Sequence, residues 1–429
     1  MAQGAWARPS IQCSAMGRLH LLIAVAIVTA CTSDEPVAPE PPTPPPEVEL
    51  DWRDVDPDLC VARGLSTSTA NLDLALQTVQ ALGVRSVRSG IHWHRVEPTP
   101  GVRDFSMFEP VIDDLLALDV EPLALLAYGN AWASSDPDAD PYYPPDDAQD
   151  FAAYAAATAE HFAGRIARYE IWNEPNAGYR FWKPALSGDP VDYGALFAAA
   201  ADAIHAVDPA AQVLLGGTFF HDQFIIGGLE FLAGIGPEAW AAADGLAFHP
   251  YTFYPPAVPP EYAGPSEMSL GDGELPLLDM IAALRGVAAD AGREDLPLVV
   301  TEFGWPDWAQ VTPEEQADWA ERSVLLGLSQ GVSTWCGYTL FHGSGLNTEH
   351  RFGMAETDGL LTPYGERMQA LGARLDGVEA AALLTLPEGQ HGVALRGPGE
   401  QVRTLVWGTG VWESDDGTVV ELEETPTGW

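Results

Sequence analysis

The 429-residue sequence has few basic residues. Lysines and arginines together number 20, against 62 aspartates and glutamates, and Lys183 is the only lysine. The formal net charge of −42 at pH 7 repels nucleic-acid phosphates and anionic lipid headgroups, which excludes DNA and RNA as partners. The simplest interpretation is that acidic side chains solvate the surface, as in a salty medium. A cationic substrate is the alternative.

Motifs for common cofactors are also missing. The sequence has no glycine-rich phosphate-binding loop, and its four cysteines and ten histidines show no spacing typical of zinc sites. His92 and His94 flank Trp93, but no further ligand-like spacing lies near them. We therefore expect no metal and no cofactor.

The apolar run at 21–30 is too short to cross a bilayer as a helix, and it follows Arg8 and Arg18 as in a signal peptide. It ends in Val28-Thr29-Ala30-Cys31, which resembles the lipobox of bacterial lipoproteins, whose cysteine is acylated. We expect residues 1–31 to be a lipoprotein signal peptide with lipidation at Cys31. A plain secretory signal, with Cys31 merely near the cleavage site, is the alternative.

Residues 32–50 are acidic and contain seven prolines between Pro36 and Pro46. Such a segment cannot bury apolar surface and is expected to form an extended tether. An anchor followed by a tether predicts an extracytoplasmic protein, in the periplasm or on the cell surface, that contacts the membrane through its lipid only.

Residues 51–375 alternate between apolar strand-like segments and helical patterns. Strands are expected at 61–66, 84–91, 122–127, 168–172, 213–216, 245–248, 298–301 and 334–340, and helices at 72–82, 107–118, 147–163 and 193–207. Strands that are apolar on both faces and alternate with helices predict a parallel sheet, and eight of them predict an α/β fold, the (β/α)8 TIM barrel. Long insertions at 129–149, 175–192, 251–276 and 342–359 follow strand ends, where barrel enzymes build their sites.

The pattern changes after residue 375. Strands at 392–395 and 402–407 flank a turn at 397–400, and 417–422 is a third candidate strand. Residues 376–429 are therefore expected to form a small β-rich module.

Two glutamates follow buried strands. Glu174 comes after the fourth expected strand, within Asn173-Glu174-Pro175, and Glu302 comes at the end of the seventh. For Asn173 and Glu174 both to face the barrel mouth, the chain must kink or bulge there. Strands four and seven lie opposite each other in an eight-stranded ring, so the two carboxyl groups can meet across it, as retaining glycoside hydrolysis requires.

Several motifs carry a wider resemblance. They are Gly83-Val84-Arg85-Ser86-Val87-Arg88, Trp93 with Val96-Glu97-Pro98, Tyr128-Gly129 with Trp132, Ile171-Trp172-Asn173-Glu174-Pro175-Asn176, Phe248-His249-Pro250-Tyr251 and Thr301-Glu302-Phe303-Gly304-Trp305. With them the chain resembles glycoside hydrolase clan A, and most of all family 39, the β-xylosidase and exopolysaccharide glycosidase group. The resemblance covers residues 61–370.

The resemblance implies a role for several residues. Glu174 matches the acid/base of the clan and Glu302 the nucleophile, while Asn173 matches the residue that bonds the sugar 2-hydroxyl. Three more match polar residues near the nucleophile: Arg88, His249 and Tyr251. Trp93, Trp132 and Trp305 are candidates for stacking on sugar rings, with packing inside the protein as the alternative.

The sequence therefore predicts a retaining glycoside hydrolase with a poly- or oligosaccharide substrate. A non-catalytic, polysaccharide-binding surface lipoprotein on the same barrel is the alternative. Barrel closure also brings the first and last strands together, so Cys60 and Cys336 are expected to form a disulfide, with two buried thiols as the alternative.

Overall fold

The computed structural model describes residues 50–65, 72–219, 227–252, 257–262, 275–308, 310–343, 348–413 and 419–428. Contacts divide the chain into Met1–Val48 and Glu49–Trp429, and the fold below is that of the second unit. The expected signal peptide, Cys31 and nearly all of the expected tether lie outside the described residues. None of the helices in the described ranges has both the length and the apolar character needed to span a bilayer.

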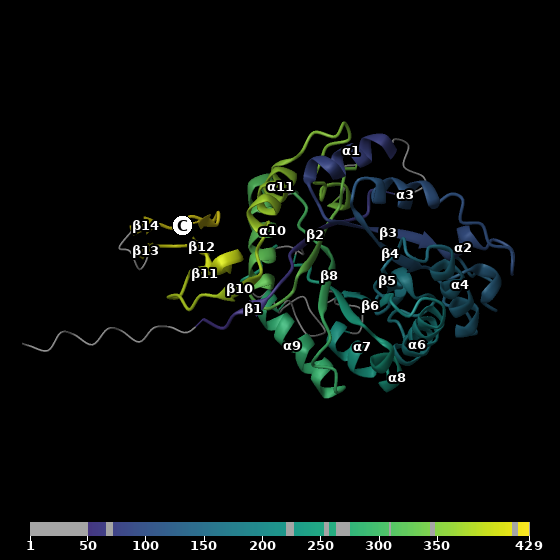
Figure 1. Cartoon of the computed structure of the whole chain (residues 1–429). Coiled ribbons are helices and arrows are strands. Elements are labelled where there is room, and N and C mark those ends of the chain that lie inside the picture. Colours follow the sequence, from purple (N-terminus) through teal and green to yellow (C-terminus); the bar gives the residue numbers. More distant parts are fainter. Residues whose placement is uncertain are drawn as a thin grey trace, which may run out of the picture. The chain divides into compact units, whose positions relative to one another are not determined.

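Eight parallel strands close into a barrel in sequential order (Figure 1). They are β2 (Asp58–Ala62), β3 (Ser86–His92), β4 (Glu121–Ala127), β5 (Arg168–Ile171), β6 (Gln212–Phe219), β7 (Gly245–His249), β8 (Leu298–Phe303) and β9 (Thr334–Tyr338). The predicted (β/α)8 barrel is confirmed, with β5 and β8 as its fourth and seventh strands.

The first strand lies earlier than its predicted range of 61–66. The start of this strand at Asp58 was missed in the sequence analysis, because a charged residue is not expected in a barrel strand. Here the Asp58 carboxylate accepts a hydrogen bond from Ser86 at 2.7 Å and pairs with Arg168 at 2.9 Å. The strand ends where Arg63 and Gly64 adopt positive φ angles of 63° and 129°.

Helices surround the barrel, and several start at sequence signals. Asp147 caps α4, Asp189 precedes Pro190 at the first position of α6, and Thr312 forms a capping box with Glu315 at α10. The helices are α1 (Leu72–Leu82), α2 (Trp93–Val96), α3 (Glu109–Ala117), α4 (Ala148–His161), α5 (Gly178–Phe181), α6 (Pro190–Val207), α7 (Gly228–Gly234), α8 (Pro237–Ala242), α9 (Leu277–Asp290), α10 (Pro313–Leu328) and α11 (Pro363–Leu375), with short 3-10 turns η1 (Ala131–Ala133), η3 (Thr348–His350) and η4 (Pro398–Glu400).

The C-terminal residues form a small antiparallel sheet beside α10 (Figure 1). Its order is β1 (Arg53–Asp54), β10 (Ala380–Leu383), β11 (Gln390–Arg396), β12 (Val402–Gly408) and β15 (Thr427–Gly428). The predicted hairpin is β11 and β12, but the third predicted strand does not join it: β14 (Val419–Glu421) pairs with β13 (Val411–Glu413) in a separate two-stranded sheet. The main sheet instead includes β1, which precedes the barrel in sequence and pairs with β10. Strands far apart in sequence can pair in this way.

Cys60 of β2 and Cys336 of β9 are direct partners in the barrel and are joined by a disulfide. Both cysteines are fully buried, and they link the first barrel strand to the last across 276 residues of chain. We expect unreduced, digested protein to give one linked peptide pair containing both cysteines, which separates only after reduction. Mass spectrometry with thiol alkylation under denaturing conditions would detect either that pair or, if the bond is absent, two alkylated cysteines.

Candidate active site

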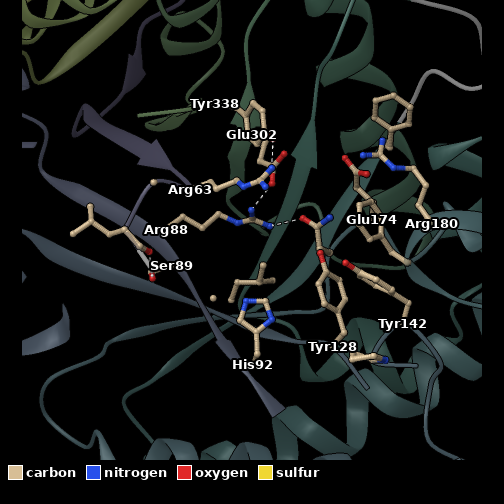
Figure 2. Close-up of a pocket in the computed structure, with 18 of the residues that line it drawn as sticks. Arg63, Arg88, Ser89, His92, Tyr128, Tyr142, Glu174, Arg180, Glu302 and Tyr338 are labelled. Atoms are coloured by element: carbon tan, nitrogen blue, oxygen red, sulfur yellow. Dashed lines mark hydrogen bonds and ion pairs between the residues drawn. The ribbon is translucent and has the colours of Figure 1, made fainter. Parts of the chain in front are cut away.

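A cavity of 710 Å³ opens at the carboxyl ends of the barrel strands (Figure 2). It lies at the end of the barrel where the sequence placed the site. Five of its lining residues were predicted from the sequence, namely Arg88, Asn173, Glu174, Tyr251 and Glu302.

The chain kinks after β5, as the sequence required. Trp172 and Glu174 adopt positive φ angles of 68° and 45°, which non-glycine residues rarely do. The Glu174 N–H is held by the Gly217 carbonyl oxygen at 2.9 Å. Because of this kink, Asn173 and Glu174 both line the cavity.

Two glycines of β6 leave room for this arrangement. A Cβ atom on Gly216 would lie 2.4 Å from the carbonyl oxygen of Ile171, and one on Gly217 would lie 2.1 Å from Nε2 of His249. Both distances are shorter than any real contact. The two glycines therefore let the kinked end of β5 and the His249 ring approach each other.

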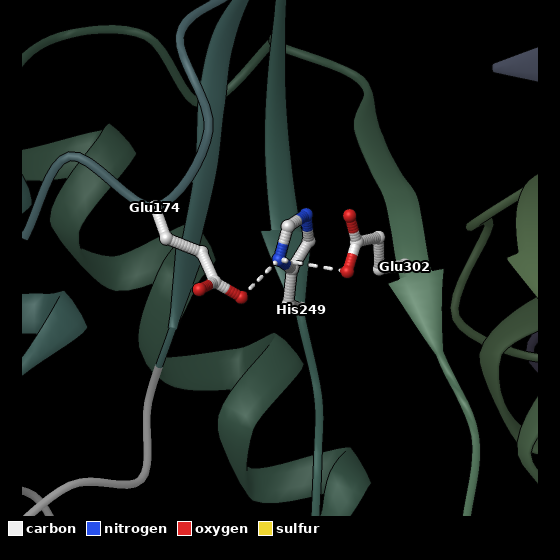
Figure 3. A group of neighbouring side chains, drawn as sticks. All are labelled: Glu174, His249 and Glu302. Carbon is white, nitrogen blue, oxygen red and sulfur yellow. Dashed lines mark hydrogen bonds and ion pairs between the residues drawn. The ribbon is translucent and has the colours of Figure 1, made fainter. Parts of the chain in front are cut away.

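His249, the last residue of β7, lies between the two glutamates (Figure 3). Its Nδ1 is 2.9 Å from Oε1 of Glu174 and 4.0 Å from Oε2 of Glu302, and its Nε2 is 3.1 Å from the Thr301 hydroxyl. One atom from each of the three side chains lies within 4.8 Å of the others. In the part of the chain that the structure describes, this is the one group close enough to hold a metal ion.

The neighbours of Glu302 orient its carboxylate and stabilise its ionised form. Arg88 donates to Oε1 at 2.5 Å, and the Tyr251 hydroxyl donates to Oε2 at 3.0 Å. Burial, the largest influence, acts to raise the pKa of Glu302, but the electrostatic effects of His249 and Arg88 and the hydrogen bonds from Tyr251 and Arg88 outweigh it. The pKa of Glu302 therefore lies below its ordinary value, and the carboxylate is ionised at neutral pH.

Tyr251 remains a hydrogen-bond donor. Burial, followed by the charge of Glu302, raises the pKa of its phenol well above the ordinary value. The hydroxyl therefore stays protonated, and its hydrogen bond holds Oε2 of Glu302 in place. The other oxygen of Glu302 is fixed by Arg88.

Glu170 is a site residue that the sequence analysis missed. It lies in the middle of β5, is fully buried, and accepts hydrogen bonds from Arg88 at 2.5 Å, from the Gly217 N–H at 2.9 Å and from Thr301 at 3.1 Å. Arg88 also donates to Asn173 Oδ1 at 2.9 Å. Glu170 therefore fixes the arginine that orients both Glu302 and Asn173, and a lone acidic residue inside an apolar strand was the available signal.

The three tryptophans expected to contact a substrate do not line the cavity. Trp93 is buried and stacks on Tyr154, with its indole N–H donating to Glu97. Trp132 donates to the Glu97 carbonyl oxygen, and the buried Trp305 donates to backbone carbonyls of the loop after β7. The prediction for these residues is corrected to the packing alternative, since their polar ends are already satisfied inside the protein.

Other aromatic rings line the cavity instead. Tyr128 and Phe181 stack in parallel with centroids 5.6 Å apart, and Tyr142 packs on Tyr128 at 4.8 Å. These rings add aromatic surface to the cavity, and Figure 2 shows two of them, Tyr128 and Tyr142.

No protein-family model and no curated protein sequence matches the chain. Its fold matches solved structures, among them a family 39 glycoside hydrolase from the gut symbiont Bacteroides cellulosilyticus, with a TM-score of 0.66 and 18% identity over 86% of this chain and 80% of that one. A family 39 glycoside hydrolase from Xanthomonas axonopodis matches with a TM-score of 0.58 and 19% identity over 87% and 75% of the two chains. A monomeric β-xylosidase from Caulobacter crescentus matches with a TM-score of 0.57 and 18% identity over 85% and 76%. At these identities the likeness is one of fold.

Proposed function

We propose that the protein is a retaining glycoside hydrolase that cleaves O-glycosidic bonds of a poly- or oligosaccharide by double displacement. One observation carries this proposal: a carboxylate oxygen of Glu174 and one of Glu302 lie within 4.8 Å of each other in the cavity. Retaining enzymes hold their carboxyl groups about 5–5.5 Å apart, whereas inverting enzymes leave about 6.5–9.5 Å for a water molecule. The fold shared with glycoside hydrolases supports the same reaction class.

Glu302 is the nucleophile in this proposal. Its ionised carboxylate attacks the anomeric carbon, the bond to the leaving oxygen breaks, and a covalent glycosyl ester forms on Glu302. Arg88 and Tyr251 hold the carboxylate in place for this attack.

Glu174 is the acid/base. It gives a proton to the leaving oxygen in the first step, then takes one from the water that attacks the ester in the second. His249 contacts Glu174 and fixes its position relative to Glu302. The two inversions at the anomeric carbon give net retention.

Asn173 is positioned to bind the sugar. Its carbonyl oxygen accepts from Arg88, so its amide N–H groups remain for a ligand, and the residue lines the cavity. This fits the 2-hydroxyl contact that the family resemblance implies.

A panel of aryl glycosides and bacterial polysaccharides tests the proposal. We expect hydrolysis of at least one, with proton NMR of the first product showing the anomeric configuration of the substrate. A non-catalytic binding protein would retain a polysaccharide and release no sugar, and an inverted product would contradict the double displacement.

We also propose that Cys31 carries lipid and holds the enzyme at a membrane facing an extracytoplasmic space, on the lipobox-like sequence alone. Replacing Cys31 by Ser is expected to move most of the protein from the membrane to the soluble fraction, because it removes the acylation site. Cell fractionation with immunoblotting measures the distribution, and Cys13→Ser is the matched control. Membrane association that persists in Cys31→Ser would contradict the anchor.

A further inference from the structure

The charge balance of the cavity is the reverse of that of the chain. In the whole sequence, acidic residues outnumber lysine and arginine 62 to 20. The described residues that line the cavity include three glutamates and four arginines: Glu174, Glu302 and Glu349, and Arg63, Arg88, Arg95 and Arg180. Two of these glutamates have catalytic roles in the proposed function, so the rest of the cavity is basic.

Two histidines of the cavity do not add to this charge. Burial, followed by the charges of His94 and Arg95, lowers the pKa of His92 to about 4, and burial also lowers the pKa of His94. Both rings are neutral at pH 7. The positive charge of the cavity therefore comes from arginines, of which Arg88 is fully used by Glu170, Glu302 and Asn173.

Arg180, in α5, is presented to the cavity by an aromatic ring. Its guanidinium lies over Phe181 at 4.8 Å from the ring centroid, and its side chain is 39% exposed. Its nearest acidic partner among the described residues is Glu349, at 3.9 Å, which is too long for a hydrogen bond. A guanidinium held by stacking keeps its N–H groups available, and its planar fork matches a carboxylate or sulfate.

Arg63 lies on the opposite side of the carboxylate pair. Figure 2 shows it beside Glu302 and Tyr338, while Arg180 is beside Glu174. Arg63 donates to the Tyr338 hydroxyl. Among the glutamates, Glu302 acts most strongly on Arg63 and Glu174 on Arg180, and the charge of Glu349 acts on both arginines. The Glu349 carboxylate, which is 55% exposed, is thus an anionic group that interacts electrostatically with both arginines.

We propose that the substrate is an acidic glycan, and that Arg180, with Arg63 opposite, binds a carboxylate or sulfate group of a sugar next to the scissile bond in place of Glu349. The proposal rests on the proposed function for its catalytic step. It is the opposite of the cationic substrate that the composition left open. The net charge of −42 does not prevent it, because salt screens distant charges beyond about 8 Å at physiological ionic strength.

Binding to matched oligosaccharides tests the proposal without turnover. The probes are β-1,4-linked gluco- and manno-oligosaccharides, the same chains with a C6 carboxylate, and the same chains with a C6 sulfate. Calorimetry in a Glu302→Gln background compares their affinities. We expect at least one acidic series to bind more tightly than its neutral partner, and the carboxylate and sulfate arms show which group is preferred.

Three variants identify the contact. Arg180→Gln is expected to lower the acidic-to-neutral affinity ratio roughly tenfold or more, as for a lost charge-assisted hydrogen bond. Glu349→Gln is expected to raise the ratio, because it removes the competing carboxylate. Arg165→Gln is the matched control, since Arg165 also lies over a phenylalanine, Phe162, at 4.8 Å but outside the cavity.

The two proposals fail in different ways. If neutral glycosides are hydrolysed but no acidic series binds more tightly, or if Arg180→Gln leaves the ratio unchanged, the acidic substrate is wrong and the glycoside hydrolase stands. If acidic chains bind through Arg180 and no glycoside is ever cleaved, the anion site stands and the enzyme does not.

Discussion

Glu302→Ala is expected to lower kcat on every glycoside substrate on the order of 10⁵-fold or more, as for other lost nucleophiles. Without its carboxylate no covalent ester can form, and no other described carboxylate takes its place at the anomeric carbon. The Glu174 carboxylate remains in position beside His249, but it acts on the leaving oxygen and on water. The loss is therefore independent of how good the leaving group is.

The same variant is expected to fold. Arg88 loses one acceptor but keeps Glu170, so its buried charge remains paired. Thermal unfolding measured by circular dichroism would check this, with Glu160→Ala, an exposed position on α4, as the matched control for both folding and activity. Wild-type rates for Glu302→Ala would place the site elsewhere.

Much of the fold could be predicted because its signals are local. Buried parallel strands read as short apolar runs, and β4, β7 and β8 overlap their predicted ranges to within two residues at each end. Glu174 and Glu302 were found because each follows such a run. The kink at Trp172 and Glu174 followed from the alternation of side chains along a strand, since Asn173 and Glu174 could not otherwise face the same way.

The rest depends on contacts between distant residues. Arg88 and Glu170 are 82 positions apart, and no sequence pattern near either residue predicts that the two are in contact. The prediction for the tryptophans was wrong for a related reason. The sequence around a tryptophan near a strand end does not show whether its indole N–H binds a sugar or, as at Trp132, a backbone carbonyl oxygen of a neighbouring loop. The sheet that joins β1 to β10 is likewise a long-range pairing of two short strands without an amphipathic pattern.

The basic cavity illustrates the same limit for electrostatics. Composition reports the sum of all charges, whereas a binding site depends on the few that face it. Arg63 follows the first barrel strand, and Arg180 lies in α5, after the fourth. Only the closed barrel brings them to opposite sides of Glu174 and Glu302. The net charge of the sequence therefore does not predict the sign of the charges that face the cavity.

Glu174→Ala is expected to behave differently from Glu302→Ala. Natural linkages need a proton on the leaving oxygen, so their hydrolysis is expected to fall roughly 10²–10⁴-fold. A dinitrophenyl glycoside leaves without that proton, so the first step should remain measurable as a burst of dinitrophenol. The second step lacks its general base, and the glycosyl-enzyme on Glu302 is expected to accumulate and to be detectable by mass spectrometry.

Azide then separates the two roles. It attacks the ester without needing a general base, so adding it to Glu174→Ala is expected to restore turnover of the dinitrophenyl glycoside and to yield a glycosyl azide of retained configuration. NMR of the product gives the configuration directly. In Glu302→Ala the only route for azide is direct displacement of the leaving group, which would give the inverted glycosyl azide. Retention in the Glu302 variant and inversion in the Glu174 variant would mean that the two glutamates have exchanged roles.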